Sequence, residues 1–277
     1  MAGGIDNFGP GTLSLSQSAV TGNRAVVAAP NGQFAEAGGI ENSAIATIDH
    51  SVVSANRLDA TGVGGEVLSF GGGIDDDGSL TLTNSTVEHN HLTALAPAGI
   101  GGFVLADAGG IEIDGTATIA DTTISANDVA AHAPDGTVVA AGGGLLAASF
   151  GGVTIQRSLI TRNSITADSA NGSAFAQGGG IANFGLMTLE QTRVIANSGS
   201  ANGPTGAVQG GGIWNSNFQG GPPTTPQLNL TDTDITANNL GSSPAGTPQG
   251  GGLYTTFPVT RTRTVIAGNK PDQCFGC

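Results

Sequence analysis

The chain has 277 residues, of which 10% are charged, and 8 Lys plus Arg stand against 21 Asp plus Glu, for a formal net charge of −13. So few charges argue against exposed helices held by ion pairs, and the acidic balance leaves no basic surface of the kind that binds nucleic acid. No apolar run reaches the roughly 18 residues of a membrane span. Met1 is not followed by the charged and apolar segments of a signal peptide, so we expect any such peptide to have been removed.

A repeat of about 35 residues fills the chain. Each copy opens with a Gly-Gly pair before an aliphatic residue and closes at an Asn. The aliphatic residues are Ile5, Ile40, Ile74, Ile111, Leu145, Ile181, Ile213 and Leu253. The asparagines are Asn23, Asn56, Asn90, Asn127, Asn163, Asn197, Asn238 and Asn269. A period of this length predicts one supersecondary unit that stacks on copies of itself.

The first predicted strand of each copy is the Gly-Gly-aliphatic segment, and the residue after it is expected to face solvent. This column runs Asp6, Glu41, Asp75, Glu112, Leu146, Ala182, Trp214 and Tyr254. Asp76, Asp77 and Asp114 enlarge its acidic part. Two readings stay open: a solvated acidic stripe, or a Ca²⁺ site made by Asp6, Glu41, Asp75, Asp76, Asp77 and Glu112.

The second predicted strand carries aliphatic residues ten and eight positions before the Asn, which is the period-two spacing of a strand with one buried face. Between them lies an outward file: Ser14, Thr47, Thr81, Thr118, Thr154, Thr188, Asn229 and Thr260. Such a file resembles the ice-contacting face of β-solenoid ice-binding proteins. Its flanking column, which includes Asp49, Ala120 and Glu190, is too mixed for a regular Thr-x-Thr plane.

A hydroxyl five positions before each Asn predicts a bend, and an aliphatic residue three before it predicts a third, inward-facing strand. The hydroxyls are Ser18, Ser51, Ser85, Thr122, Ser158, Thr192, Thr233 and Thr264. We expect the hydroxyls and the asparagines to form ladders of hydrogen bonds from coil to coil. After the Asn, small-residue excursions with central turns such as Pro134-Asp135-Gly136 predict β-arms that protrude from one edge.

The seventh copy breaks the pattern with a long insertion between its Gly-Gly pair and its Asn. Trp214 and Tyr254 are the only Trp and Tyr, and the register places them side by side on neighbouring coils. We expect them, with Phe218, Phe257 and the loop from Phe218 to Pro226, to form the main surface for a glycan or a partner protein. The alternative is that the loop folds back and buries the rings.

The chain ends in Cys274-Phe-Gly-Cys277. A redox role needs a βαβ context that is absent here, so a terminal disulfide is the better interpretation, and it favours an oxidising, extracytoplasmic setting. We expect one domain over residues 1–277, with repeats over 3–269 and a cap over 270–277. The N-terminal end begins in mid-pattern, which leaves it open to stack on an upstream domain or on another copy.

The Gly-Gly-Gly-Ile and Ser-x-Val/Ile-x-x-Asn motifs resemble those of bacterial right-handed parallel β-helix repeat proteins. These include the polymorphic outer-membrane proteins and, more distantly, the pectate-lyase-like fold. The resemblance implies an all-β, right-handed parallel β-helix of about eight coils, one repeat per coil. It implies a secreted or cell-surface, adhesin-like scaffold as readily as a polysaccharide lyase or hydrolase. Because the motifs of the related pectin hydrolases are missing, we expect a non-catalytic scaffold, with a glycan-cleaving enzyme as the alternative and ice binding as a second one.

Overall fold

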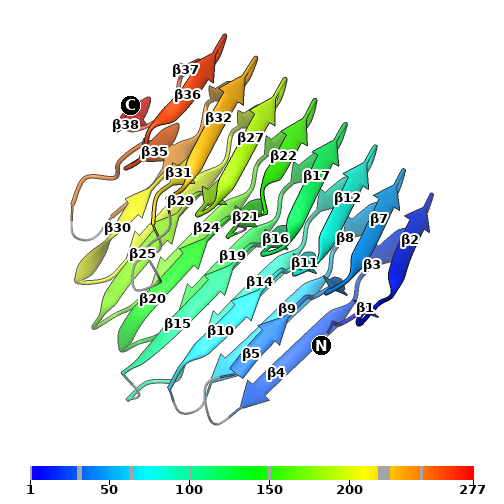
Figure 1. The fold of residues 1–277 in the computed structure, drawn as a ribbon. Coiled ribbons are helices and arrows are strands. Elements are labelled where there is room, and N and C mark those ends of the chain that lie inside the picture. Colours follow the sequence, from blue (N-terminus) through cyan, green and yellow to red (C-terminus); the bar gives the residue numbers. More distant parts are fainter. Residues whose placement is uncertain are drawn as a thin grey trace.

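The computed structural model describes residues 2–29, 33–62, 65–99, 101–148, 151–217, 225–243 and 246–277, and every regular element in these ranges is a β-strand. The strands stack in parallel as a right-handed β-solenoid, with five sheets that run along its axis (Figure 1). Seven coil-to-coil steps of 33, 34, 37, 36, 34, 41 and 31 residues join the eight asparagines, so the chain makes about seven turns between them. The predicted fold class is confirmed.

Each strand of a repeat joins a different sheet, named A to E in chain order. Sheet A contains β1 (Ile5–Asn7), β6 (Ile40–Asn42), β11 (Ile74–Asp76), β16 (Ile111–Ile113), β21 (Leu145–Ala147), β26 (Ile181–Asn183), β31 (Ile213–Asn215), β35 (Leu253–Thr255) and β38 (Cys274–Phe275). Sheet B contains β2 (Thr12–Ser16), β7 (Ile45–Asp49), β12 (Ser79–Thr83), β17 (Thr116–Ala120), β22 (Val153–Gln156), β27 (Leu186–Glu190), β32 (Gln227–Thr231) and β36 (Val259–Thr262). Sheet C contains β3 (Ala19–Thr21), β8 (Val52–Ser54), β13 (Thr86–Glu88), β18 (Thr123–Ser125), β23 (Leu159–Thr161), β28 (Arg193–Ile195), β33 (Asp234–Thr236) and β37 (Val265–Ala267).

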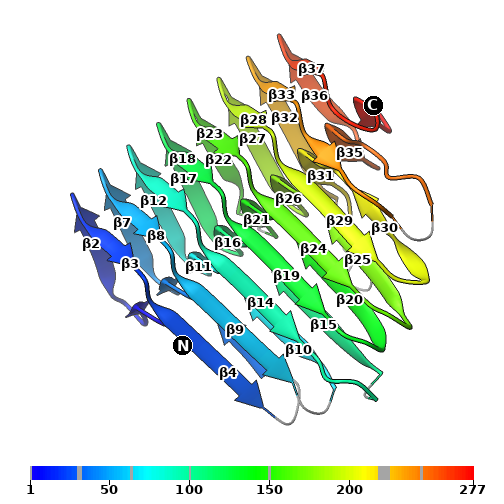
Figure 2. The ribbon, with the colours of Figure 1, turned by 180° about the vertical axis from the view of Figure 1, so that it is seen from behind.

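The predicted arms supply the other two sheets. Sheet D contains β4 (Arg24–Ala29), β9 (Arg57–Gly62), β14 (His91–Leu95), β19 (Asp128–His132), β24 (Ser164–Asp168), β29 (Ser198–Asn202) and β34 (Asn239–Leu240). Sheet E contains β5 (Gln33–Glu36), β10 (Val67–Phe70), β15 (Gly102–Asp107), β20 (Gly136–Ala141), β25 (Ser173–Gln177) and β30 (Thr205–Gln209). The arms extend to one side of the coil, as expected, and each pairs with the arms of neighbouring coils (Figure 2).

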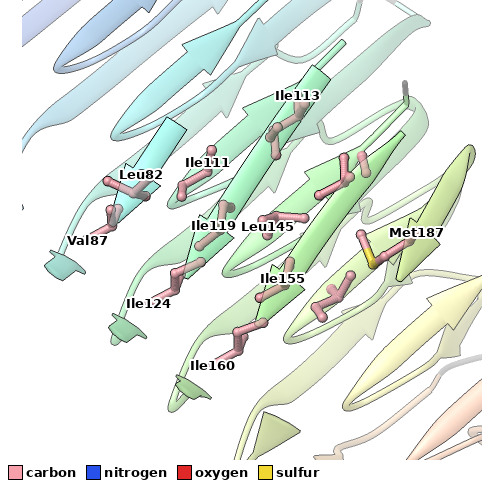
Figure 3. Close-up of a cluster of buried hydrophobic side chains, with 14 of the residues drawn as sticks. Leu82, Val87, Ile111, Ile113, Ile119, Ile124, Leu145, Ile155, Ile160 and Met187 are labelled. Carbon is pink, nitrogen blue, oxygen red and sulfur yellow. The ribbon is translucent and has the colours of Figure 1, made fainter. Parts of the chain in front are cut away.

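Two hydrophobic cores result from this arrangement. Sheets A, B and C enclose the first, in which the predicted inward columns stack coil upon coil (Figure 3). Ile111, Ile119 and Ile124, one from each sheet, are fully buried there. The second core lies between sheets D and E and consists mainly of Ala, Val and Leu, because the two sheets pack face to face through short side chains.

Both predicted ladders form. Asn127 is fully buried; its Nδ2 donates to Asn163 Oδ1 and to the carbonyl oxygen of Val87, each at 3.0 Å, and the same pattern recurs along the column. The backbone N–H of Ser51 donates to Ser85 Oγ at 3.0 Å in the hydroxyl ladder. The paired glycines allow neighbouring coils to approach closely, since a Cβ on Gly73 would lie 2.6 Å from the carbonyl oxygen of Gly110.

Candidate functional site

Sheets A and E meet at a corner, where three columns of side chains face away from the first core. The middle column, on sheet A, contains Asp6, Glu41, Asp75, Glu112, Leu146, Ala182, Trp214, Tyr254 and Phe275. On one side, sheet E and its continuation present Glu36, Phe70, Asp107, Ala141, Gln177, Gln209 and Gln249. On the other side, Ser43, Asp77, Asp114, Ala148, Phe184, Ser216 and Thr256 follow the sheet A strands.

The prediction that the carboxyls of the middle column form a solvated stripe is wrong. Asp6 on the first coil is exposed, but Glu41, Asp75 and Glu112 are only 3 to 5% exposed. The reason is that the arm strands stack into sheet E, whose outer face flanks the column, so a side chain that leaves the first core enters the corner instead of solvent. The sequence predicted which side chains of β11 and β16 leave the first core, but not that sheet E lies beside them.

We call the carboxyl-rich N-terminal part the acidic corner: Glu36, Glu41, Asp75, Asp77, Asp107, Glu112 and Asp114. Burial raises the pKa of Asp75 to about 7 and the pKa of Glu112 well above its usual value. The two side chains hydrogen-bond to each other, which requires that they share a proton. Burial also raises the pKa of Asp107 well above its usual value, and nearby Asp114 adds to the shift.

Asp76 points away from Asp75, although the charges of Asp77 and Asp114 still act on it. Its grouping with Asp75 and Asp77 as metal ligands stays a prediction. Asp76 is fully buried on the opposite face of β11, where its Oδ1 accepts a hydrogen bond of 2.5 Å from Asn42 Nδ2. Burial raises the pKa of Asp76 to about 7. Asp75 and Asp76 point to opposite faces because successive residues of a strand do so.

Within the described ranges, no group of three or more His, Cys, Asp or Glu side chains is arranged so that it could hold a metal ion. The Ca²⁺ site stays a prediction.

The C-terminal part is the apolar corner: Ala108, Ala141, Leu146, Ala182, Phe184 and Trp214, with Ala148 and Tyr254 packed against them. Trp214 and Tyr254 lie on neighbouring coils, as expected, with ring centroids 6.4 Å apart and an interplanar angle of 5°. Phe275 continues the stack at 5.1 Å from Tyr254. The expected exposure of Trp214 is wrong, however, since Trp214 is 1% exposed.

Trp214 contacts both the preceding coil and sheet E. The ring of Phe184, from the preceding coil, lies 4.9 Å from it, and Trp214 Nε1 donates to Gln209 Oε1 at 3.2 Å. Tyr254 and Phe257 are half-buried, and Phe257 lies in the turn that follows β35. Phe218 and most of the loop up to Pro226 lie outside the described residues.

A hollow of about 340 Å³ lies over the outer face of sheet B. The Thr file forms much of its floor, with Thr81, Thr118, Thr154 and Thr188 on four successive coils. Ser79 and Thr116 add hydroxyls, Gly152 leaves space, and Leu186 stands at the end as a wall, 41% exposed. In the column that runs from Ile45 to Leu186, the three intervening residues are Ser79, Thr116 and Gly152. Their side chains are small or absent, and this leaves the hollow.

Several of these residues were missed at the level of sequence. Asp107 directly precedes Ala108-Gly109-Gly110, as Glu36 precedes Ala37-Gly38-Gly39, so the column before the glycine pairs carried a signal. Phe184 and Gly152 had none, because nothing in their sequence positions marks a corner or a hollow.

Cys274 and Cys277 form a disulfide, as predicted, and β38, which begins at Cys274, adds a ninth strand to sheet A. The described residues form no helix with the length and apolar character that a membrane crossing requires. Comparison of the chain with protein-family models, with curated proteins and with solved structures finds no match.

Proposed function

We propose that the protein is a non-catalytic binding scaffold, secreted or displayed at the cell surface, whose sheet B binds a glycan. The observation that carries this proposal is the hydroxyl-lined hollow over β12, β17, β22 and β27. Its volume of about 340 Å³ lies in the range of small-ligand sites.

The chemistry of the hollow suits a sugar ring. Ser and Thr hydroxyls both donate and accept hydrogen bonds, so a row of them matches the hydroxyls of a pyranose. The Leu186 side chain supplies an apolar wall for the C–H face of the ring. Because the hydroxyls stand on strands held from both sides, little conformational entropy is lost when a ligand binds.

The resemblance to polymorphic outer-membrane-protein repeats supports an adhesin-like role and a bacterial source. The disulfide between Cys274 and Cys277 agrees with an oxidising compartment. Ice binding is less well supported, because the hollow and the Leu186 side chain interrupt the flat Thr plane.

The experiment compares the wild type with Thr118→Val plus Thr154→Val on a glycan array, followed by calorimetry with the best glycan. Valine keeps the branched shape and removes two hydroxyls from the floor. Thr47→Val plus Thr260→Val is the matched control, because these residues belong to the same file but do not line the hollow.

We expect the floor variant to lose at least about tenfold in affinity, which corresponds to 1.4 kcal/mol, and the control to bind like the wild type. Equal losses in both variants, or no glycan bound by the wild type, would refute the proposal.

A second candidate is glycan cleavage, favoured by the hydrogen-bonded pair Asp75 and Glu112. A carboxyl with a pKa near 7 can act as a general acid, and paired carboxyls are the usual catalysts of glycoside hydrolysis. Release of reducing ends from a polysaccharide panel by the wild type, but not by Glu112→Gln, would establish this activity and overturn the non-catalytic assignment.

A further inference from the structure

We propose, on the premise that sheet B binds a glycan, that its hollow selects a neutral, unbranched oligosaccharide that lies along the solenoid axis. Glu190, the last residue of β27, is the residue to which we assign this selectivity. Its carboxylate accepts a hydrogen bond from a sugar hydroxyl and repels a glycan that carries uronate or sulfate groups.

The hollow is elongated along the solenoid axis. Its floor threonines stand on four successive strands, β12, β17, β22 and β27, which span about 14 Å at the spacing of parallel strands. Along each strand, the outward side chains that line the hollow occupy only two positions, such as Thr116 and Thr118, about 7 Å apart. A ligand that fills the hollow is therefore longer along the axis than across it, which fits a linear chain of sugar rings.

Exposed aliphatic side chains stand at both ends of this length. Leu186 on β27 and Ile45 on β7 occupy one column, with Ser79, Thr116 and Gly152 between them. Leu186 is 41% exposed and Ile45 is 54% exposed. Sugar rings have C–H faces that pack on apolar groups, so a chain that reaches both ends gains two such contacts in addition to the hydrogen bonds of the floor.

A third column of side chains borders the floor and includes Glu190. It runs through Thr83, Ala120, Gln156 and Glu190 on the same four strands. Gln156 Nε2 donates to Glu190 Oε2 at 2.8 Å, which holds the carboxylate on the same face of β27 as Thr188. A carboxylate accepts several hydrogen bonds, so Glu190 can bind a sugar hydroxyl while it keeps its bond to Gln156.

The charges along this column favour a neutral ligand. Asp49 continues the column on β7, and hydrogen bonds from three neighbours, chief among them Asn84, lower its pKa, so it is ionised at neutral pH. Arg157 lies at the bend after β22, but its guanidinium donates two hydrogen bonds to Asp121, at 2.9 and 2.7 Å. An anionic glycan along the hollow would meet a carboxylate at each end of the column, Asp49 and Glu190, and like charges repel it.

The test begins with a glycan array that carries neutral, uronate-containing and sulfated glycans, both linear and branched. Calorimetry then compares the best linear oligosaccharide with its own disaccharide. We expect the wild type to prefer neutral linear glycans and to bind the oligosaccharide at least about tenfold more tightly than the disaccharide, because only the longer chain reaches both ends of the hollow.

Two variants assign the selectivity to residues. Glu190→Gln removes the charge and keeps the shape of the side chain, and we expect the preference for neutral over uronate-containing glycans to fall at least about tenfold. Glu88→Gln removes a half-exposed carboxylate from sheet C and is its matched control. Leu186→Ala should weaken oligosaccharide binding at least about fivefold, whereas Val265→Ala, which trims an exposed side chain on sheet C, should not.

The proposal is overturned, with glycan binding by sheet B left in place, if the best ligand is branched or anionic or if the disaccharide binds as tightly as the longer chain. An unchanged preference in Glu190→Gln, or wild-type affinity in Leu186→Ala, has the same consequence. If the wild type binds no glycan on the array, glycan binding and its selectivity are both refuted. The comparison of chain lengths needs only the wild type, so it decides the question if a variant does not fold.

Discussion

The acidic and the apolar parts of the corner use the same positions of the same sheet, yet they are stabilised in opposite ways. Glu112 and Leu146 are register partners on neighbouring strands, and both are buried. Around Leu146 the corner is filled by Ala, Phe and Trp side chains, whereas around Glu112 it is filled by carboxyls that must hold protons to stay buried.

This difference shows that the fold does not require acidic residues at the corner. The coils are held by the Asn and hydroxyl ladders and by the two cores, which continue unchanged past both parts. A buried carboxyl cluster that an apolar column could replace points to a role other than stability, because it lowers the stability of the folded chain.

The largest expected effect comes from emptying the apolar corner. Trp214→Ala removes a fully buried side chain that packs on Phe184 and Tyr254, and we expect the free energy of unfolding to fall by about 3 to 5 kcal/mol. Urea unfolding at pH 7 measures the loss. A change below about 1 kcal/mol would mean that the apolar corner contributes little.

Exchanging register partners between the acidic corner and the apolar corner should change the free energy of unfolding in opposite directions. Glu112→Leu copies Leu146 into the acidic corner, and at pH 8 we expect it to raise the free energy of unfolding by about 1 to 3 kcal/mol, because it removes a carboxyl that must take up a proton to remain buried. Leu146→Glu is the reciprocal variant and should lower it. Destabilisation by Glu112→Leu would show that the carboxyl is a structural requirement.

The smallest effect is expected at the end of the aromatic stack. Phe275 is 39% exposed and stacks on Tyr254 at the end of the column, so Phe275→Ala should cost about 0.5 to 1.5 kcal/mol. The same unfolding experiment checks this value. A loss as large as that of Trp214→Ala would contradict the view that burial increases toward the middle of the column.

The sequence predicted the repeat, the inward columns, both ladders and the pairing of Trp214 with Tyr254, because each depends on a strict period along the chain. Ile124 and Asn127, for example, recur at fixed positions in every copy. Because neighbouring coils stack in register, a regular period along the chain is enough to predict which side chains lie above one another.

Exposure could not be predicted in the same way. Whether Glu112 and Trp214 face solvent depends on sheet E, which forms only when arms from different coils stack beside sheet A. The residues that cover them, such as Phe184 and Asp107, come from other strands and follow no shared motif. Sequence alternation tells which face a side chain takes but not what lies across from that face.

The dependence of stability on pH most directly tests the central claim, that burial holds the carboxyls of Asp75 and Glu112 in their protonated form in the folded chain. Asp75 and Asp76 have a pKa of about 7 in the folded chain against 3.8 usually, so the folded state binds more protons than the unfolded state between these values. The free energy of unfolding must then fall as pH rises from about 4 to 7, by about 1.4 kcal/mol per pH unit for each extra proton. The lowered pKa values of Asp59, Asp121 and Asp232 act only below this window.

The measurement is urea unfolding of the wild type and of Asp75→Leu plus Glu112→Leu at pH 5, 6, 7 and 8, without divalent cations. We predict that the wild type is clearly more stable at pH 5 than at pH 8 and that the double variant shows a shallower decline, because Asp75 and Glu112 no longer take up protons whereas Asp76 still does. A wild type whose stability is constant or rises between pH 5 and pH 8 would contradict the account.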